Sequence, residues 1–190
     1  MTLLAIVTLL ALLAPVVLPV GMFELRSPDS RVEFVVKDNR GGFTGEAREV
    51  GGTITVRERD AGYAADVDVR IDARAIRTGA TLRDAQLRSP TFLHTASFPF
   101  ITFSGAVAAD GPAGPQFKGI MRGRLTIKSV TREVEVPLDI ALEGTTYAAR
   151  GEVLVKFSDF GMPLPRFLFF VAEDPVLVKL QVRLQPKSPS

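Results

Sequence analysis

The chain has 190 residues, of which 46% are hydrophobic and 23% are charged, a length that fits one domain with or without a leader and a composition that excludes a disordered chain. The formal net charge is only +2 and the basic residues are scattered among acids, so no nucleic-acid partner is expected. Cysteine is absent, which excludes disulfide bonds, thiolate nucleophiles and Cys-ligated metals.

The first residues resemble an export signal. Residues 3–23 carry no charge and include the run "LLAIVTLLALLAPVVLPVG", which is typical of a secretory signal peptide. We expect cleavage near residues 20–22, although the run lacks a preceding Lys or Arg and a clean A-x-A motif. An uncleaved anchor is the alternative, because about 20 apolar residues can cross a bilayer. Arg26 and Arg31 lie on its C-terminal flank, the wrong side for an exported domain.

The predicted organisation is therefore a signal peptide or N-terminal anchor over residues 1–22, one domain over 23–186 and a tail over 187–190. The predicted location is periplasmic or secreted, with attachment to the membrane if the leader is retained.

Most of the remaining chain alternates apolar and polar residues, as strands with one buried face do. Short stretches rich in Gly and Pro, such as "DGPAGP", separate the alternating segments, so we expect antiparallel neighbours in a sandwich or an up-and-down barrel. The alternating segments are 31–37, 51–58, 63–71, 117–127, 132–142, 145–157 and 176–185.

Residues 76–103 interrupt this series. Thr81 and Asp84 have the spacing of a capping box, and Pro90 disfavours helix in the residue before it. We therefore predict a helix of about two turns over residues 81–89, followed by a loop with apolar residues. This helical insert is expected on the mouth or the side of the barrel.

The same stretch contains the side chains from which an enzyme would have to be built. A lipid-modifying enzyme would use Asp84, Arg88 and His94, but no Ser or Cys nucleophile accompanies the histidine in a recognisable motif. Arg88 is four positions after Asp84, the spacing of a helical ion pair, which favours a structural role. Asp66 and Asp68 share a strand face, but a metal site is not expected from them.

Four blocks of the sequence, in order, resemble the YceI-like polyisoprenoid-binding proteins. They are "SPDSRVEFVV", "IDARAIRTGATLRDAQLRSPTFLHTASFPFITF", "GRLTIKSVTREVEVPL" and "FSDFGM". The resemblance runs from about Phe23 to Leu184. In the second and longest block the matching residues are Asp72, Thr78, Arg83, Asp84, Leu87, Ser89, Phe92, Pro99, Ile101 and Phe103.

This resemblance implies an extended, lipocalin-like antiparallel barrel that encloses an isoprenoid chain, an isoprenoid quinone or a similar amphiphile. It also implies export to the periplasm, no enzymatic activity, a membrane-proximal role and a homodimer in some members. No other cofactor and no metal are expected. A barrel filled by its own side chains, acting as a secreted interaction protein, is the alternative.

The inward faces of the predicted strands and the insert give the residues expected to line the lumen. We expect the wall to include Phe34, Val36, Val67, Val69, Ile71, Leu87, Phe92, Ile101, Phe103, Leu125, Ile127, Leu138, Val153, Val155, Phe157 and Phe169.

Phe157 is the most informative of these residues. It stands where an arginine is common in the family, and it has the parity of Val153 and Val155. It is therefore predicted to face inward and to make one end of the lumen unusually apolar, unless a bulge before Ser158 turns it outward.

Overall fold

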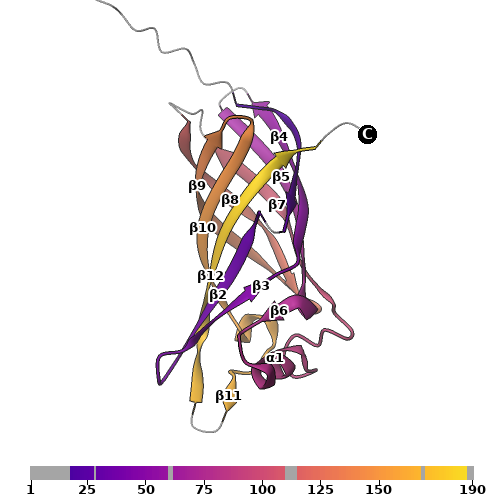
Figure 1. The fold of residues 1–190 in the computed structure, drawn as a ribbon, viewed down its shortest axis with the longest axis vertical. Helices are drawn as coiled ribbons and strands as arrows, with labels where there is room; N and C mark the ends of the chain where they lie inside the picture. Colours follow the sequence, from indigo (N-terminus) through magenta and orange to yellow (C-terminus); the bar gives the residue numbers. More distant parts are fainter. Residues whose placement is uncertain (1–17, 28, 60–61, 110–114, 168–169, 188–190) are drawn as a thin grey trace, which may run out of the picture.

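The computed structural model describes residues 18–27, 29–59, 62–109, 115–167 and 170–187. Antiparallel strands wrap around a long axis, and one short helix lies at the lower end (Figure 1). The predicted all-β barrel with a helical insert is confirmed. The elements are β1 (Gly21–Arg26), β2 (Arg31–Asp38), β3 (Phe43–Ala47), β4 (Val50–Arg59), β5 (Gly62–Asp72), η1 (Ala73–Ala75), β6 (Ile76–Arg77), α1 (Thr81–Arg88), β7 (Phe100–Ala109), β8 (Gln116–Ile127), β9 (Val130–Glu143), β10 (Thr146–Lys156), η2 (Ser158–Phe160), β11 (Arg166–Phe167) and β12 (Phe170–Pro186).

Eight strands close the barrel in the order β1-β4-β5-β7-β8-β9-β10-β12, and β12 pairs with β1 to complete the ring. Strand β12 is long enough to pair with β2 as well, and β2 continues through β3 to β6. The upper end of the barrel is thus a closed ring, whereas the lower end is completed by β2, β3, β6 and the insert (Figure 1).

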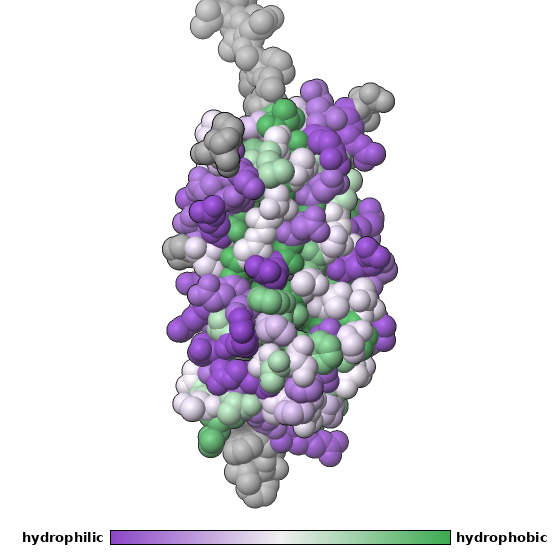
Figure 2. Space-filling view, turned by 90° about the vertical axis from the view of Figure 1, so that its right-hand side faces the viewer, coloured by the Kyte–Doolittle hydropathy of each residue, from purple (hydrophilic) through white to green (hydrophobic). Residues whose placement is uncertain are grey.

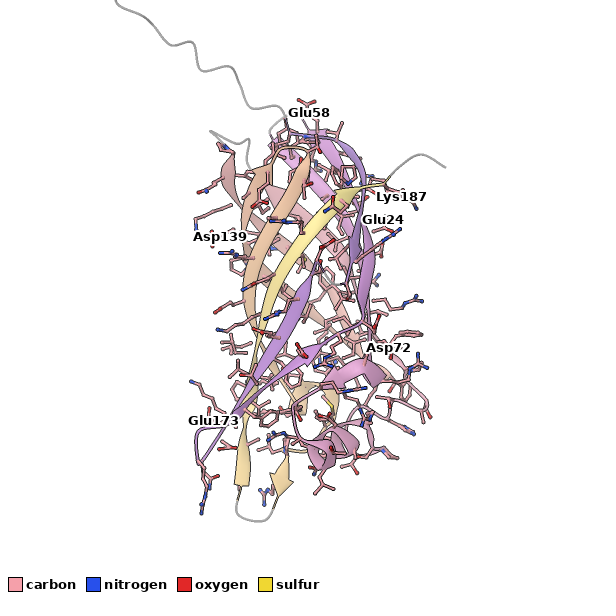
Figure 3. The ribbon with its side chains drawn as sticks, viewed as in Figure 1. Glu24, Glu58, Asp72, Asp139, Glu173 and Lys187 are labelled. Atoms are coloured by element: carbon pink, nitrogen blue, oxygen red, sulfur yellow. The ribbon has the colours of Figure 1, made fainter. Side chains whose placement is uncertain are left out.

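The alternation in the sequence translates into an apolar lumen and a polar exterior. On β5, Val67 is 4% exposed, while Asp66 pairs on the outside with Arg57 of β4. Figure 3 shows the labelled charged side chains on the outer surface, among them Glu24 and Lys187, which form an ion pair beside the β1–β12 seam. One outer face carries hydrophilic residues on both sides of a pale to hydrophobic strip (Figure 2). Burial inside the barrel, rather than these exposed pairs, supplies the main stabilisation.

The insert forms the predicted helix but not the predicted cap. Helix α1 begins at Thr81 and ends before Ser89, with Ala80 as its N-cap and no side-chain cap hydrogen bond. The expected capping box of Thr81 and Asp84 is wrong, because the Asp84 carboxylate accepts hydrogen bonds from Thr78 instead. Gly79 has φ +76°, a left-handed conformation that turns the chain so that Thr78 lies beside the first helical turn. In the described part of the chain, no helix has the length and apolarity needed to cross a membrane.

Candidate functional site

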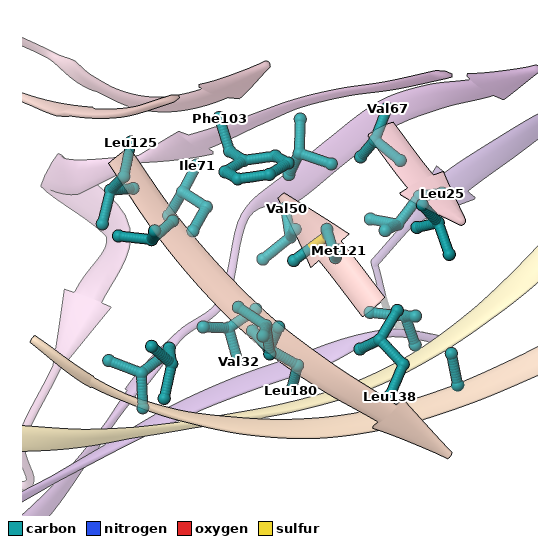
Figure 4. A pocket seen from close by; sticks show the side chains of 18 of the residues that line it. Leu25, Val32, Val50, Val67, Ile71, Phe103, Met121, Leu125, Leu138 and Leu180 are labelled. Carbon is teal, nitrogen blue, oxygen red and sulfur yellow. The ribbon is translucent and has the colours of Figure 1, made fainter. Parts of the chain in front are cut away.

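The barrel encloses an apolar cavity of about 310 Å³, and Figure 4 shows side chains of its wall from close by. The lining residues extend from the strands beside the upper hairpins to the insert. The cavity wall is made by side chains from the barrel strands, together with Leu87 of α1, Leu93 of the following loop and Met162 after η2. Among the described residues that line it, Lys156 is the only charged one, and Tyr63 and Tyr147 are the only others with a polar side-chain atom. The interior therefore offers dispersion contacts and almost no hydrogen bonds.

Thirteen of the residues expected in the wall lie there. Two others are buried elsewhere: Val36 is 0% and Phe92 is 3% exposed, but neither lines the cavity. Phe169 lies outside the described residues. The thirteen are Phe34, Val67, Val69, Ile71, Leu87, Ile101, Phe103, Leu125, Ile127, Leu138, Val153, Val155 and Phe157.

Glycines on the inner face keep the lumen open around Phe103. Gly105 and Gly123 face each other across β7 and β8, and a Cβ built on either would lie within 2.9 Å of Phe103 Cζ. The ring therefore rests against the wall over the glycine pair, where a larger residue would push it into the lumen. This is one reason why a barrel rich in phenylalanine still contains a cavity.

Strand periodicity could have found many of the lining residues that we did not predict. Val32 shares a face with Phe34, and Tyr147 shares a face with Val153 and Val155. Alternate residues in the middle of β12 also line the cavity, namely Val176, Val178, Leu180, Val182 and Leu184. Leu93 and Met162 lie in loops without periodicity, so only the tertiary structure reveals their position.

The lower end of the cavity is closed by the turn around η2. Phe157, Phe160 and Met162 are 9%, 2% and 6% exposed. The Phe157 carbonyl accepts hydrogen bonds from the Phe160 and Met162 amides, and Asp174 anchors the turn from β12 by accepting from the Ser158 amide and hydroxyl at 3.0 and 2.5 Å. These bonds fix the direction of the Phe157 side chain, which lines the cavity although β10 ends one residue earlier.

Thr78 joins Arg83 and Asp84, two charged residues of the longest sequence block. The Asp84 carboxylate accepts from the Thr78 amide at 2.8 Å and from its hydroxyl at 2.6 Å. Arg83 Nε donates to the same hydroxyl at 3.0 Å, and the guanidinium stacks on the Phe43 ring of β3 at 3.9 Å. Adjacent residues of a helix point about 100° apart, but Arg83 and Asp84 both reach Thr78 because it precedes the helix. The cluster attaches α1 to the barrel.

Asp84 is charged and structurally engaged. Burial alone would raise the pKa of Asp84, but the hydrogen bonds from Thr78 and the charges of Arg88 and Arg77 outweigh it and hold the pKa below its ordinary value. We expect Asp84→Ala to lower the free energy of unfolding by about 2–3 kcal/mol, because two buried donors lose their acceptor. Asp84→Asn, which keeps an acceptor oxygen, should cost less.

The pH dependence of these variants separates charge from shape. Because the folded-state pKa is lowered, the stabilisation by the Asp84 charge is present above the unfolded-state pKa of about 4 and is lost as the pH falls through the folded-state value. Urea unfolding of wild type and Asp84→Asn should therefore give a difference that shrinks in acid. A difference that is the same at pH 7 and pH 3 would contradict a role for the charge.

The side chains proposed for an enzyme have separate structural partners. Arg88 donates to the Arg74 carbonyl at 3.5 Å and forms no ion pair with Asp84, so the predicted helical ion pair is wrong. Asp84 accepts from Thr78 at Oδ1 instead. His94 Nε2 lies 3.1 Å from Ser97 Oγ, and its backbone has φ 47° within a series of turns. None of Asp84, Arg88 and His94 is among the residues that line the cavity. The structure does not bring them together around a pocket.

A metal centre has no support either. Asp66 pairs with Arg57 on the barrel exterior. Within the described ranges, no three or more His, Asp or Glu side chains come together in a way that could hold a metal ion.

Comparison with known proteins matches this geometry. The profile of the YceI-like domain matches residues 23–185. Protein YceI of Escherichia coli O6:H1 is 35% identical over 128 residues, and the match spans 62% of each chain. Among solved structures, BcnA of Burkholderia cenocepacia superposes with a TM-score of 0.68 at 23% identity, covering 81% of this chain and 95% of its own.

Two further structures share the fold. A polyisoprenoid-binding domain from Saccharophagus degradans, implicated in plant cell wall breakdown, superposes with a TM-score of 0.65 at 14% identity, covering 89% of this chain and all of that domain. The YceI protein of Campylobacter jejuni superposes with a TM-score of 0.61 at 21% identity over 76% of this chain and 85% of its own. With the family profile covering nearly the whole barrel, the chain belongs to the YceI-like family.

Proposed function

We propose that the protein is a non-enzymatic binding protein that encloses the apolar chain of an isoprenoid or a similar amphiphilic lipid in its barrel. The observation that carries this proposal is the cavity of about 310 Å³ with a wall of aliphatic and aromatic side chains. Membership of the family and the likeness to a polyisoprenoid-binding domain support it. A barrel filled by its own side chains would leave no space of this size.

The size of the cavity sets the length of chain that it can accept. A dry cavity of about 150 Å³ is known to hold benzene. By that measure, 310 Å³ takes roughly a dozen carbon atoms, or between two and three isoprene units. Each buried CH₂ contributes about 0.8 kcal/mol, so affinity should rise about fourfold per carbon and level off once the cavity is full.

The predicted export of the chain gives this binding a location. We expect the domain to act in the periplasm or outside the cell, near a membrane that supplies its ligand. The charge-free N-terminal run and the family resemblance support this expectation. The resemblance also suggests a homodimer, which the molecular mass in solution would test.

Native mass spectrometry of protein purified without detergent tests the function directly. We expect a co-purified apolar molecule, or uptake of added farnesol with unit stoichiometry. A series of primary alcohols of increasing chain length should show the rise in affinity and the plateau. An empty protein that takes up neither farnesol nor any member of the series would refute the proposal.

A further inference from the structure

The two tyrosines of the chain lie at the same end of the cavity. Tyr63 follows the β4–β5 hairpin, and Tyr147 follows the β9–β10 hairpin, 84 residues later. Both line the cavity. Tyr147 is 4% exposed, and its ring packs edge-to-face on Phe23 with centroids 5.1 Å apart. Lys156, the only charged residue among the described ones at the cavity wall, lies nine positions further along β10, about 30 Å away, and is exposed on the same face as Leu154.

The Tyr147 hydroxyl is a permanent hydrogen-bond donor. Burial, with a smaller contribution from Tyr63, raises the pKa of Tyr147 to about 12, so the phenol stays protonated at physiological pH. Its hydroxyl donates to the Pro19 carbonyl at 2.7 Å. A buried hydroxyl that loses such a partner costs free energy, so this position favours an acceptor oxygen.

The segment that supplies this oxygen occupies the cavity as an amphiphile would. Leu18 is 2% exposed and its side chain lines the cavity, while the next residue places its carbonyl on Tyr147. Both residues precede the expected cleavage near residues 20–22. Removal of the leader would therefore withdraw an apolar group and an uncharged acceptor together.

We infer that Tyr147 forms a head-group site for an uncharged acceptor oxygen, such as the carbonyl of an isoprenoid ketone or quinone, and that Leu18 and Pro19 occupy this site until the leader is removed. This inference rests on the proposed function and adds the chemistry of the head group. An anionic head is disfavoured at this end, because no cationic side chain among the described lining residues is near enough to neutralise it.

Three probes of equal length test the site in the full chain: dodecane, methyl decyl ketone and dodecanoate. We expect wild type to bind the ketone about fivefold more tightly than dodecane, the effect of one net hydrogen bond. In Tyr147→Phe the ratio of the two affinities should fall to about one. In Leu18→Ala, dodecane and the ketone should each bind severalfold more tightly than to wild type. The Leu18–Pro19 segment competes with them for the cavity, and this variant removes its apolar contact.

A direct readout accompanies the affinities. The carbonyl stretch of isotopically labelled methyl decyl ketone should move to lower frequency on binding to wild type, relative to its value in hexane. An unshifted stretch, or an unchanged affinity ratio in Tyr147→Phe, overturns the inference. So does tighter binding of dodecanoate than of the ketone, which would show that the site prefers an anionic head. Binding of none of the probes, even by Leu18→Ala, would instead refute the proposed function and this inference with it.

Discussion

Phe157→Arg is expected to weaken binding of a long isoprenoid chain at least tenfold and to lower the free energy of unfolding by about 3 kcal/mol or more. Phe157 lines the lower end of the cavity and is 9% exposed. Its backbone is fixed by hydrogen bonds to Met162 and to the Asp174 carbonyl, so the new side chain starts in the inward direction. No Asp or Glu is among the described residues that line the cavity, so an inward guanidinium meets no partner there.

The length of the ligand makes this test specific. Farnesol should lose more affinity than the shorter geraniol, because the longer chain fills more of the cavity and therefore has less room to avoid the altered lower end. Competition with a fluorescent apolar probe and urea unfolding give the two measurements. Phe157→Leu controls for loss of the ring. Leu154→Arg controls for the added charge, since Leu154 lies on the same strand and is 66% exposed. If Phe157→Arg binds farnesol as wild type does, the side chain has turned outward and does not line the site.

Ala65→Phe is expected to block the cavity without unfolding the barrel. Ala65 lies on β5 between Val56 of β4 and Val107 of β7, and all three residues line the cavity. The added phenyl group needs about the space of a benzene molecule, roughly half of the 310 Å³ available. Affinity for farnesol should fall at least tenfold.

The stability of Ala65→Phe should not fall together with its affinity for farnesol. This result would distinguish a blocked cavity from a destabilised barrel. The ring fills empty space and gains dispersion contacts, so the melting temperature should stay the same or rise. Ala106→Phe is the matched control, because Ala106 is an exposed residue on β7 and points away from the lumen. Equal farnesol binding by the two variants would show that the lumen is not the binding site. A large fall in the melting temperature of Ala65→Phe would show that the space at this level is already filled.

Local periodicity in the sequence was enough to predict the inward face of several barrel strands. A strand places alternate residues on opposite faces, so the run that contains Val67, Val69 and Ile71 had to place these residues on one side and the intervening charges on the other. The inward side is recognisable because it is apolar. The helix was predictable for a similar local reason, since Pro90 limits its end. The order of the four sequence blocks indicated the family.

Contacts between distant segments decided the rest. Asp84 could have bonded with Thr81 or Arg88 by spacing alone, but the turn at Gly79 brought Thr78 to it first. Tyr63 and Tyr147 meet at one end because hairpins far apart in sequence close the same ring.

The sequence by itself therefore determined which residues of most strands face inward, the presence of the insert and the absence of cysteine chemistry. Only the tertiary structure decided that the lumen stays partly empty. The space left inside a barrel is a small difference between the volume that the strands enclose and the summed volume of the inward side chains. That difference depends on how opposite walls fit, as where Phe103 lies over Gly105 and Gly123, and no local pattern of residues contains it.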